Sequence, residues 1–370
     1  MRALVVRPPG AGVELIDCPS PSLSPGGVRV GVLECGICGT DHDIVEGKYG
    51  RPPGGAPYLI LGHENLGVVR EVGTTTRGFA PGDLVVATVR RGCGRCRFCR
   101  TNHSDFCETG GFTERGIVGA HGYMADEYVD TPEYLVKVPV GLRPLAVLLE
   151  PLSVVEKSVF QGQRVLDRKE PTFGQPRVEA PRALIAGTGA IGMLGALVLM
   201  MRGYRVTAID RHGSDTPSAR LLQRVGARHE NVAAGFGGLE EERFDLVLEA
   251  TGSVSVDFSL MDRLNPNGVL VLTGIPDAAE PPATVPGGHL LRDLVLGNQA
   301  VVGSVNANRT YFESGLRDLA VAEERWPGAA GAMITGRRPI DDYSEVFAHR
   351  GGGGVKTVLT IGAETGRVSP

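Results

Sequence analysis

The sequence predicts an α/β chain in which a β-rich segment precedes a doubly wound parallel sheet. Three observations support this fold class. The 370 residues exceed what one hydrophobic core usually supports, so two domains are expected. The first 150 or so residues consist of short β-branched runs separated by Gly and Pro, which is typical of a β-rich domain. From residue 182 onward strand and helix periods alternate, which indicates βαβ units.

The individual elements follow from the same patterns. Helical spacing of apolar residues predicts a helix over 152–160, and the polar segment 162–181 is interpreted as a hairpin or surface insertion. The short glycine run 351–354 is interpreted as a turn. Strands are predicted over 28–33, 67–72, 84–89, 245–249, 268–273, 300–305 and 356–361.

Charge and hydropathy exclude some classes of function. A net charge of −4 does not favour nucleic acid or an anionic membrane surface as a partner. The start of the chain has a short apolar run that ends at Pro8, too short for a signal peptide, so a cytoplasmic location is expected. The uncharged stretch 185–201 has only 17 residues and several glycines, so it is not interpreted as a membrane span.

A glycine pattern in that stretch predicts dinucleotide binding. It matches G-x-G-x-x-G between a strand and a long apolar helix, where glycines permit close approach of a pyrophosphate. The alternative is ordinary glycine-mediated helix packing. The predicted contacts are Gly187, Thr188, Gly189, Ala190, Ile191 and Gly192, with Thr251 and Gly252 further along the chain.

The preference between NAD and NADP depends on the end of the next strand. The Asp210 carboxylate can accept hydrogen bonds from ribose hydroxyls and would repel a 2′-phosphate, which favours NAD. The Arg211 guanidinium could pair with that phosphate, so NADP stays possible. We weigh the carboxylate more heavily because it ends the strand, whereas Arg211 follows in a loop.

Four crowded cysteines predict a structural metal. Cys93, Cys96, Cys99 and Cys107 follow C-x2-C-x2-C-x7-C, a spacing that lets one loop surround a Zn²⁺ ion tetrahedrally. Four thiolates leave no position for a substrate, so the ion would be structural. Reduced bystander cysteines and an iron–sulfur cluster are the alternatives.

A second set of residues could form an open metal site. Cys38, His63, Glu64 and Glu150 offer one thiolate, one imidazole and two carboxylates, which would leave room for water or a substrate oxygen. Each also has a structural interpretation: Cys38 could be a small core residue, and Glu150 could favour a helix N-terminus. A zincin motif is excluded because Gly67 stands where its second His would be.

Taken together, CGICGTD, GHENLG, the four cysteines, LEPLS and GTGAIG make the chain resemble the zinc-dependent medium-chain dehydrogenases. Within that superfamily it is most similar to the glucose dehydrogenases typical of archaea. The resemblance implies a GroES-like catalytic domain over 1–158 with a structural-zinc lobe at about 90–110. A Rossmann domain over 159–309 would be inserted, and 310–370 would return to the catalytic domain.

The resemblance also implies residue roles. Cys38 and His63 would be firm ligands of a catalytic zinc, while Glu64 and Glu150 exchange with water and substrate. Thr40 would carry the substrate proton onward, and Asp41 would orient His63. Glu114 and Asn306 would bind sugar hydroxyls, together with Thr40 and Glu150. Two positions depart from relatives: Asp43 stands where many have a relay His, and Val89 where some have a sugar-binding Asn.

The resulting hypothesis is a zinc-dependent oxidoreductase that transfers a hydride from a sugar or secondary alcohol to NAD or NADP, with two zinc ions per chain. A glucose-like aldose is favoured as the substrate. A polyol, inositol or natural-product alcohol is the alternative within the superfamily. A non-catalytic dinucleotide-binding protein is the alternative from another class. We further expect a homo-oligomer, either a dimer or a tetramer, with a small-molecule sugar or alcohol as its partner.

Overall fold

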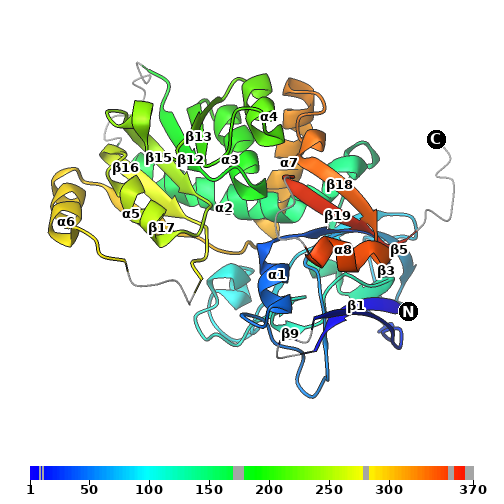
Figure 1. Cartoon of the computed structure of the whole chain (residues 1–370). Coiled ribbons are helices and arrows are strands. Elements are labelled where there is room, and N and C mark those ends of the chain that lie inside the picture. Colours follow the sequence, from blue (N-terminus) through cyan, green and yellow to red (C-terminus); the bar gives the residue numbers. More distant parts are fainter. Residues whose placement is uncertain (8–9, 11, 170–178, 278–282, 349–353, 363–370) are drawn as a thin grey trace. The chain divides into compact units, whose positions relative to one another are not determined.

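The computed structural model describes residues 1–7, 10, 12–169, 179–277, 283–348 and 354–362 (Figure 1). The chain forms two compact units. The first contains Met1–Ser153, Asn306–Val321 and Ile334–Pro370, and the second contains Val154–Val305 and Ala322–Met333. The first unit is therefore completed by segments that follow the second unit in the sequence.

The first unit is built on a seven-stranded, mostly antiparallel sheet. Its strand order is β11-β6-β5-β3-β19-β18, and β10 also pairs with β3. The last described strand, β19, is antiparallel to β3, with Cys35 opposite Leu359. The strands are β3 (Val28–Ile37), β5 (Glu64–Val72), β6 (Leu84–Ala87), β10 (Glu127–Asp130), β11 (Leu135–Lys137), β18 (Ile334–Pro339) and β19 (Lys356–Thr360).

Two small sheets and several helices complete this unit. The sheet β2-β1-β4 contains Val13–Asp17, Arg2–Val6 and Leu59–Ile60, and the sheet β7-β8-β9 contains Arg90–Arg91, Thr113–Arg115 and Gly119–Ala120. The helices here include α1 (Gly39–Val45) and α8 (Tyr343–Ala348), and α7 (Arg309–Arg325) begins here. Short 3-10 helices cover Cys99–Thr101, Ser104–Phe106, Pro132–Tyr134, Val140–Leu148 and Ile340–Asp342.

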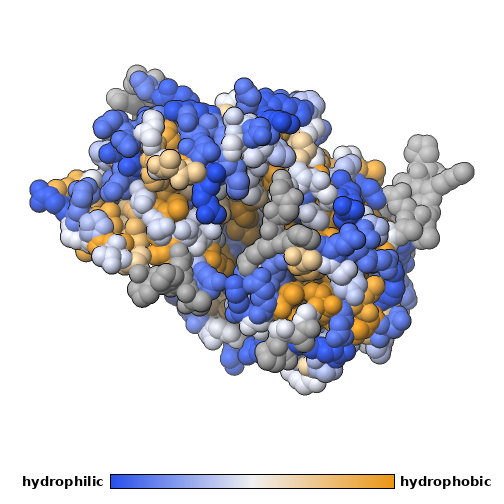
Figure 2. Space-filling model, in the orientation of Figure 1, coloured by the Kyte–Doolittle hydropathy of each residue, from blue (hydrophilic) through white to orange (hydrophobic). Residues whose placement is uncertain are grey.

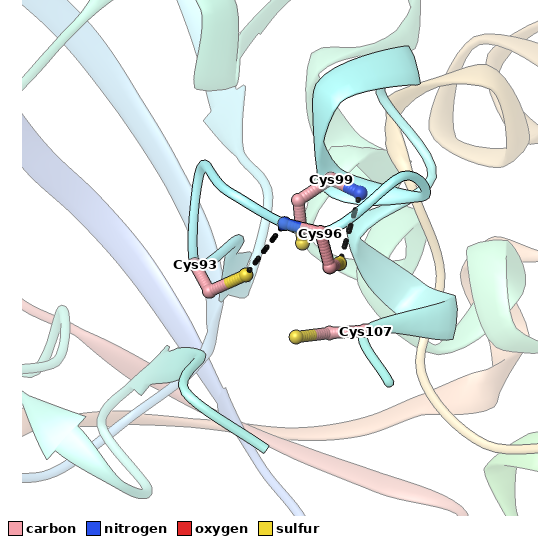
Figure 3. A group of neighbouring side chains, drawn as sticks. All are labelled: Cys93, Cys96, Cys99 and Cys107. Carbon is pink, nitrogen blue, oxygen red and sulfur yellow. Dashed lines mark hydrogen bonds between the residues drawn. The ribbon is translucent and has the colours of Figure 1, made fainter. Parts of the chain in front are cut away.

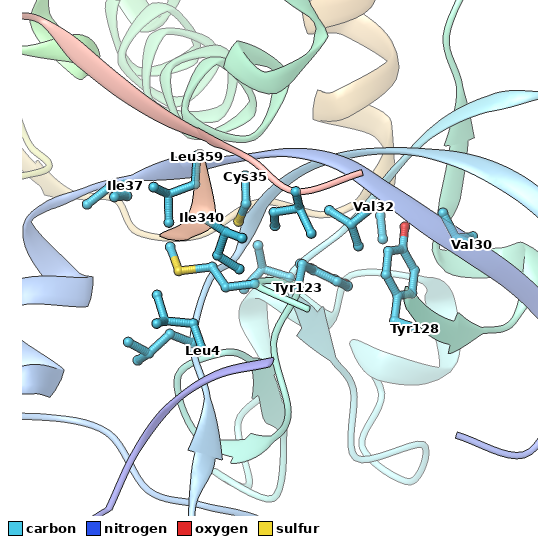
Figure 4. Close-up of a cluster of buried hydrophobic side chains, with 14 of the residues drawn as sticks. Leu4, Val30, Val32, Cys35, Ile37, Tyr123, Tyr128, Ile340 and Leu359 are labelled. Atoms are coloured by element: carbon cyan, nitrogen blue, oxygen red, sulfur yellow. The ribbon is translucent and has the colours of Figure 1, made fainter. Parts of the chain in front are cut away.

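The core of the first unit is formed by apolar residues of these strands and of the segments that connect them. Leu4, Cys35, Tyr123 and Leu359 come from distant parts of the sequence and belong to one buried cluster (Figure 4). Burial of this apolar surface is the main source of stability for the unit. The cluster therefore anchors β3, the strand that leads into the first candidate metal site.

The second unit is a six-stranded parallel sheet with strand order β14-β13-β12-β15-β16-β17. Numbered within the unit this is the order 3-2-1-4-5-6, which is that of a Rossmann fold. The strands are β12 (Arg182–Ala186), β13 (Arg205–Asp210), β14 (Arg228–Asn231), β15 (Phe244–Glu249), β16 (Leu264–Leu272) and β17 (Ala300–Gly303). The predicted α/β class and doubly wound sheet are confirmed.

The helices that accompany this sheet include an apolar central one, α3, whose interior residues are almost all buried. Parallel strands covered by helices explain why β12 and β15 are near-continuous apolar runs. The helices are α2 (Leu149–Leu166), α3 (Ala190–Met201), α4 (Pro217–Val225), α5 (Val254–Met261) and α6 (Gly287–Leu296). Short 3-10 helices cover Asp167–Lys169, Gly237–Leu239 and Gly331–Met333.

One structural prediction was wrong. Residues 162–169, interpreted as the start of a hairpin or insertion, are helical, because α2 continues to Leu166 and a 3-10 turn follows to Lys169. Residues 170–178 and 351–353 lie outside the described residues. Strand β3 is also longer than the predicted 28–33, since its end pairs with β19. None of the described helices is long and apolar enough to cross a bilayer.

Candidate metal and cofactor sites

The first candidate metal site is formed where β3 ends and β5 begins. Cys38 is the N-cap of α1: its thiol accepts from the Thr40 N–H at 3.3 Å, and the Asp41 carboxylate accepts the Cys38 N–H at 3.0 Å. Glu64 opens β5 directly opposite Gly36 of β3. A Cβ atom at Gly36 would lie 2.0 Å from the Glu64 carboxylate, so only glycine leaves room for that side chain.

The side chains of Cys38, His63 and Glu64 converge, with their ligand atoms all within 4.8 Å of one another. Cys38 Sγ is 3.1 Å from His63 Nε2. On the other side of the ring, His63 Nδ1 lies 3.5 Å from Asp41 Oδ1, and neither buried atom has a hydrogen-bond partner among the described residues. A thiolate, an imidazole and a carboxylate converging at one buried point suit a zinc ion.

Electrostatics at this site reflect burial and close opposite charges. Burial alone would lower the pKa of His63, but the Cys38 and Asp41 side chains raise it well above its ordinary value. Glu150, near the start of α2, is not in the 4.8 Å group but interacts electrostatically with His63 and Glu64. Burial raises the pKa of Glu150 to about 7. A bound divalent cation would favour the deprotonated forms of all these groups.

Sequence reasoning missed one residue of this site. Lys356, the first residue of β19, donates to both Glu64 oxygens at 2.6 and 2.7 Å and to the Ile37 carbonyl at 3.1 Å. Burial would lower the pKa of Lys356, and the Glu64 carboxylate raises it. The pair is 292 positions apart in sequence, so no local spacing could have indicated it. In this structure Glu64 is thus bound to an ammonium group.

The four predicted lobe cysteines form a second cluster, with their sulfur atoms within 4.8 Å of one another (Figure 3). The thiols of Cys93 and Cys96 each accept a backbone N–H, from Cys96 and Cys99 respectively, both at 3.4 Å. Hydrogen bonds from the Thr109 hydroxyl and nearby backbone lower the pKa of Cys93 to about 5. Four converging sulfurs fit a tetrahedral zinc.

The two predicted sugar-binding residues meet although they are 192 positions apart. Glu114 is on β8 and only 4% exposed, and its Oε1 accepts a hydrogen bond from Asn306 Nδ2. Asn306 holds a left-handed backbone conformation with φ of +61°, which asparagine tolerates better than other side chains. Val89, by contrast, is 2% exposed and belongs to the apolar core.

In the second unit, the predicted G-x-G-x-x-G motif forms the turn between β12 and α3. Gly187 has φ of +95°, and Gly189 is the N-cap of α3. A Cβ atom at Gly192 would lie 1.8 Å from the Gly187 carbonyl oxygen. The turn therefore requires glycine where a pyrophosphate would approach the helix N-terminus.

The Asp210 carboxylate ends β13 as predicted, but it already accepts several hydrogen bonds. Thr188 Oγ1 and the His212 N–H donate to it, the latter at 2.7 Å, and His229 Nε2 lies 3.2 Å away. Burial would raise the pKa of Asp210, and these hydrogen bonds lower it. Arg211 is exposed. The Thr188 and His229 contacts were not foreseen from the sequence.

Thr251 and Gly252 follow β15 and surround a buried carboxylate. The Thr251 hydroxyl donates to Glu249 at 2.6 Å, and the Gly252 N–H donates at 2.8 Å. Glu249 is fully buried, and the Gly274 N–H also donates to it at 3.1 Å. Glu249 thus fixes the loop that presents the two predicted cofactor residues.

Comparisons with known proteins agree with this architecture. The family "Alcohol dehydrogenase GroES-like domain" matches residues 24–140, and "Glucose dehydrogenase C-terminus" matches residues 143–361. The glucose 1-dehydrogenase of Methanocella arvoryzae is 40% identical over 350 residues, which is 93% of this chain and 95% of that protein. Glucose 1-dehydrogenase 1 of Caldivirga maquilingensis is 41% identical over 366 residues, or 98% and 99% of the two chains.

A solved structure is similar across the whole chain. The Haloferax mediterranei glucose dehydrogenase in complex with NADP, Zn and gluconolactone has a TM-score of 0.87 and 29% identity, covering 98% of this chain and all of that one. The GroES-like and Rossmann parts define a zinc-dependent medium-chain dehydrogenase that uses NAD or NADP. Within this class, the chain belongs to the glucose dehydrogenase family.

Proposed function

We propose that this enzyme oxidises the C1 hydroxyl of a glucose-like aldose to the lactone. The observation that carries the proposal is the Glu114–Asn306 contact, which brings a carboxylate and an amide together in the unit that holds the metal-binding residues. Such groups bind sugar hydroxyls by hydrogen bonds. The relatives named glucose 1-dehydrogenase and the gluconolactone-bound structure support the same substrate class.

The proposed roles of the chain's residues are those that the family resemblance implies, and the convergence of Cys38, His63 and Glu64 supports them. Cys38, His63, Glu64 and Glu150 would hold the catalytic zinc, and Cys93, Cys96, Cys99 and Cys107 the structural one, giving two zinc ions per chain. When bound, zinc stabilises negative charge on the substrate oxygen, and the nicotinamide accepts the hydride. Thr40 would take up the hydroxyl proton, and Asp41 would orient the His63 ring.

Purified enzyme can be tested with aldoses, polyols and simple alcohols in the presence of each cofactor. We expect an aldose to have the highest kcat/KM, with gluconolactone-type products. Glu114→Ala and Asn306→Ala should raise the sugar KM about five- to 150-fold, with a smaller effect on a short-chain alcohol. A preference for a polyol or another secondary alcohol would replace this proposal. Val89, which stands where some relatives have a sugar-binding Asn, favours that alternative.

Metal analysis tests the ligand assignment. The wild-type protein should contain two zinc ions per chain, and Cys38→Ser should lose one of them together with activity, while the four-cysteine lobe keeps the other. Near-wild-type turnover and metal content in Cys38→Ser would reject the catalytic site. A single zinc per chain in the wild type would instead support a non-catalytic relative.

For the cofactor we propose a preference for NAD. Support comes from the Asp210 carboxylate at the end of β13, whose negative charge would repel a 2′-phosphate. We expect a higher kcat/KM with NAD than with NADP. In Asp210→Ala the ratio of these two kcat/KM values should fall towards one or reverse. A tenfold preference of the wild type for NADP would show that the exposed Arg211, and not Asp210, determines the cofactor preference.

We also propose that the enzyme acts as a cytoplasmic homo-oligomer, with domains dividing near residues 158 and 309. An edge strand supports self-association: β17 pairs only with β16 among the described strands, and edge strands readily pair with another chain. Val301 of β17 and Leu291, Val295 and Leu296 of α6 are exposed apolar residues, and Figure 2 shows hydrophobic surface beside α6 at the left of the view. Val301→Lys should reduce the oligomer mass in light scattering, whereas Val140→Lys should not.

A further inference from the structure

Arg90 is a buried cation for which the proposed function gives no role. It lies on β7, directly across from Glu114 on β8. Its Nε and Nη2 both donate to Glu114 Oε1, at 3.0 and 2.8 Å. The guanidinium stacks 3.9 Å from the centre of the Phe112 ring, and the residue is only 9% exposed. Arg90 is therefore held in one orientation by strand pairing, ring stacking and a buried ion pair.

The donors around Glu114 all converge on one of its two oxygens. Asn306 Nδ2 donates to the same Oε1 atom as Arg90. Among the described residues, none donates a hydrogen bond to Oε2. One oxygen is thus saturated by two neighbours, and the other remains an acceptor of fixed direction. A substrate hydroxyl can donate to an acceptor presented in this way.

Arg90 also joins this carboxylate to the four-cysteine lobe. Its Nη1 donates to the Asp105 carbonyl at 3.2 Å, two residues before Cys107. The Asp105 side chain, 5% exposed, accepts from Asn308 Nδ2 at 3.0 Å, and Asn308 Oδ1 accepts the Thr310 N–H at 2.9 Å. The lobe therefore holds the Glu114 side chain through Arg90, and the segment that carries Asn306 through Asn308.

We propose that Arg90 is a positioning residue for substrate recognition. It connects the proposed sugar-binding residues Glu114 and Asn306 to the four-cysteine lobe. The lobe then has a role besides stability: it sets the direction of the free Glu114 oxygen. This inference rests on the proposed sugar-binding role of Glu114. It concerns KM for the sugar, because the hydrogen bonds of Arg90 to described residues go to Glu114 and Asp105, and not to the metal-binding or dinucleotide-binding residues named above.

Removing the guanidinium leaves a buried carboxylate without its countercharge, and such a carboxylate reorients or recruits water. Arg90→Met keeps most of the side-chain volume beside Phe112 but removes the charge. We expect it to raise the sugar KM about tenfold or more, as for other lost charged hydrogen bonds, with cofactor KM unchanged within about twofold. Arg90→Lys keeps the charge but lacks the planar set of guanidinium N–H donors, so we expect an intermediate rise in the sugar KM.

The matched control is Arg97→Met, which removes an arginine of the same lobe. Arg97 is 76% exposed at its side chain, pairs with surface Glu108 at 3.2 Å and lies 4.6 Å from the centre of the Phe98 ring. It should leave the sugar KM unchanged. Zinc content and melting temperature of all variants show whether the lobe is still folded.

A double-mutant cycle separates positioning from general destabilisation. If Arg90 acts through Glu114, then Arg90→Met combined with Glu114→Gln should have nearly the sugar KM of Glu114→Gln alone. Additive effects of the two changes, or an unchanged sugar KM in Arg90→Met, would overturn the proposal. Should Arg90→Met not fold, the same cycle with Arg90→Lys applies. A wild-type enzyme that oxidises no aldose would reject the proposed function instead, so the two failures are distinguishable.

Discussion

At the scale of single residues, the ion pair between Lys356 and Glu64 is the least expected feature of the enzyme. Both side chains are about 2–3% exposed, so each charge depends on the other for compensation. Removing one partner of a buried pair is far more costly than removing both, because an uncompensated charge remains. Since Glu64 is also a proposed zinc ligand, this pair links β19 to the metal site.

Lys356→Met should therefore destabilise the protein by about 3–5 kcal/mol. Combining it with Glu64→Gln should recover a large part of that loss, because no buried charge is then left alone. Urea unfolding monitored by circular dichroism measures both. Equal stabilities of Lys356→Met and wild type would show that the pair is dispensable.

Asp210 should make the free energy of unfolding depend on pH. Its folded pKa is lowered, so the contribution is fully present above the unfolded pKa of about 3.9 and is lost as the pH falls through the lowered folded value. Asp210→Asn should be less stable than wild type near neutral pH, and the difference in melting temperature should shrink below about pH 4. Asp215→Asn, at an exposed position of the same unit, is the matched control for removal of one carboxylate charge. A constant Asp210→Asn difference from pH 7 to pH 3 would contradict this reasoning.

At the scale of elements, the turn between β12 and α3 offers a matched pair of glycines. A Cβ atom at Gly192 would collide with the Gly187 carbonyl, whereas one at Gly189 meets nothing within 4 Å, and Gly189 has a φ of −71° that other residues adopt. Both residues lie in the turn that is predicted to bind the pyrophosphate, but only Gly192 lacks room for the methyl group of alanine.

We expect Gly192→Ala to lower the melting temperature and to weaken cofactor binding in the absence of substrate, since the turn must open to accept the methyl group. Gly189→Ala should keep the melting temperature of wild type. Binding of reduced cofactor can be followed by its fluorescence. Identical melting temperatures for the two variants would show that the turn relaxes freely.

At the scale of the whole molecule, the metal-binding and dinucleotide-binding residues belong to different compact units. The first unit contains both cysteine-containing clusters, and the second contains residues 187–192 and Asp210. Each unit has its own apolar core. Loss of metal should accordingly act on one unit before the other.

Dialysis against a chelator should abolish turnover and destabilise the first unit, while reduced cofactor still binds with an affinity within about tenfold of the original. Zinc readdition should restore activity if the lobe has not aggregated. Cofactor binding that disappears in parallel with zinc content would show that the units do not behave independently.

The sequence alone determined those features that depend on short spacing. The doubly wound sheet follows from alternating periods, the β12–α3 turn from three glycines, and the lobe from four cysteines within 15 residues. These patterns are local because a turn or a wrapped metal needs neighbouring residues. The family and enzyme class followed from the same motifs, and the comparisons confirm them.

Only the tertiary structure decided which distant charges meet. Lys356 reaches Glu64 because β19 pairs with β3 beside β5, and Arg90 faces Glu114 because β7 pairs with β8. The helical course of residues 162–169 was likewise missed, since their polar composition hid a continuation of α2. Strand register and burial fix such contacts, and neither is encoded in the spacing of one segment. Burial then turns each of these pairs from a weak surface contact into one on which the site depends.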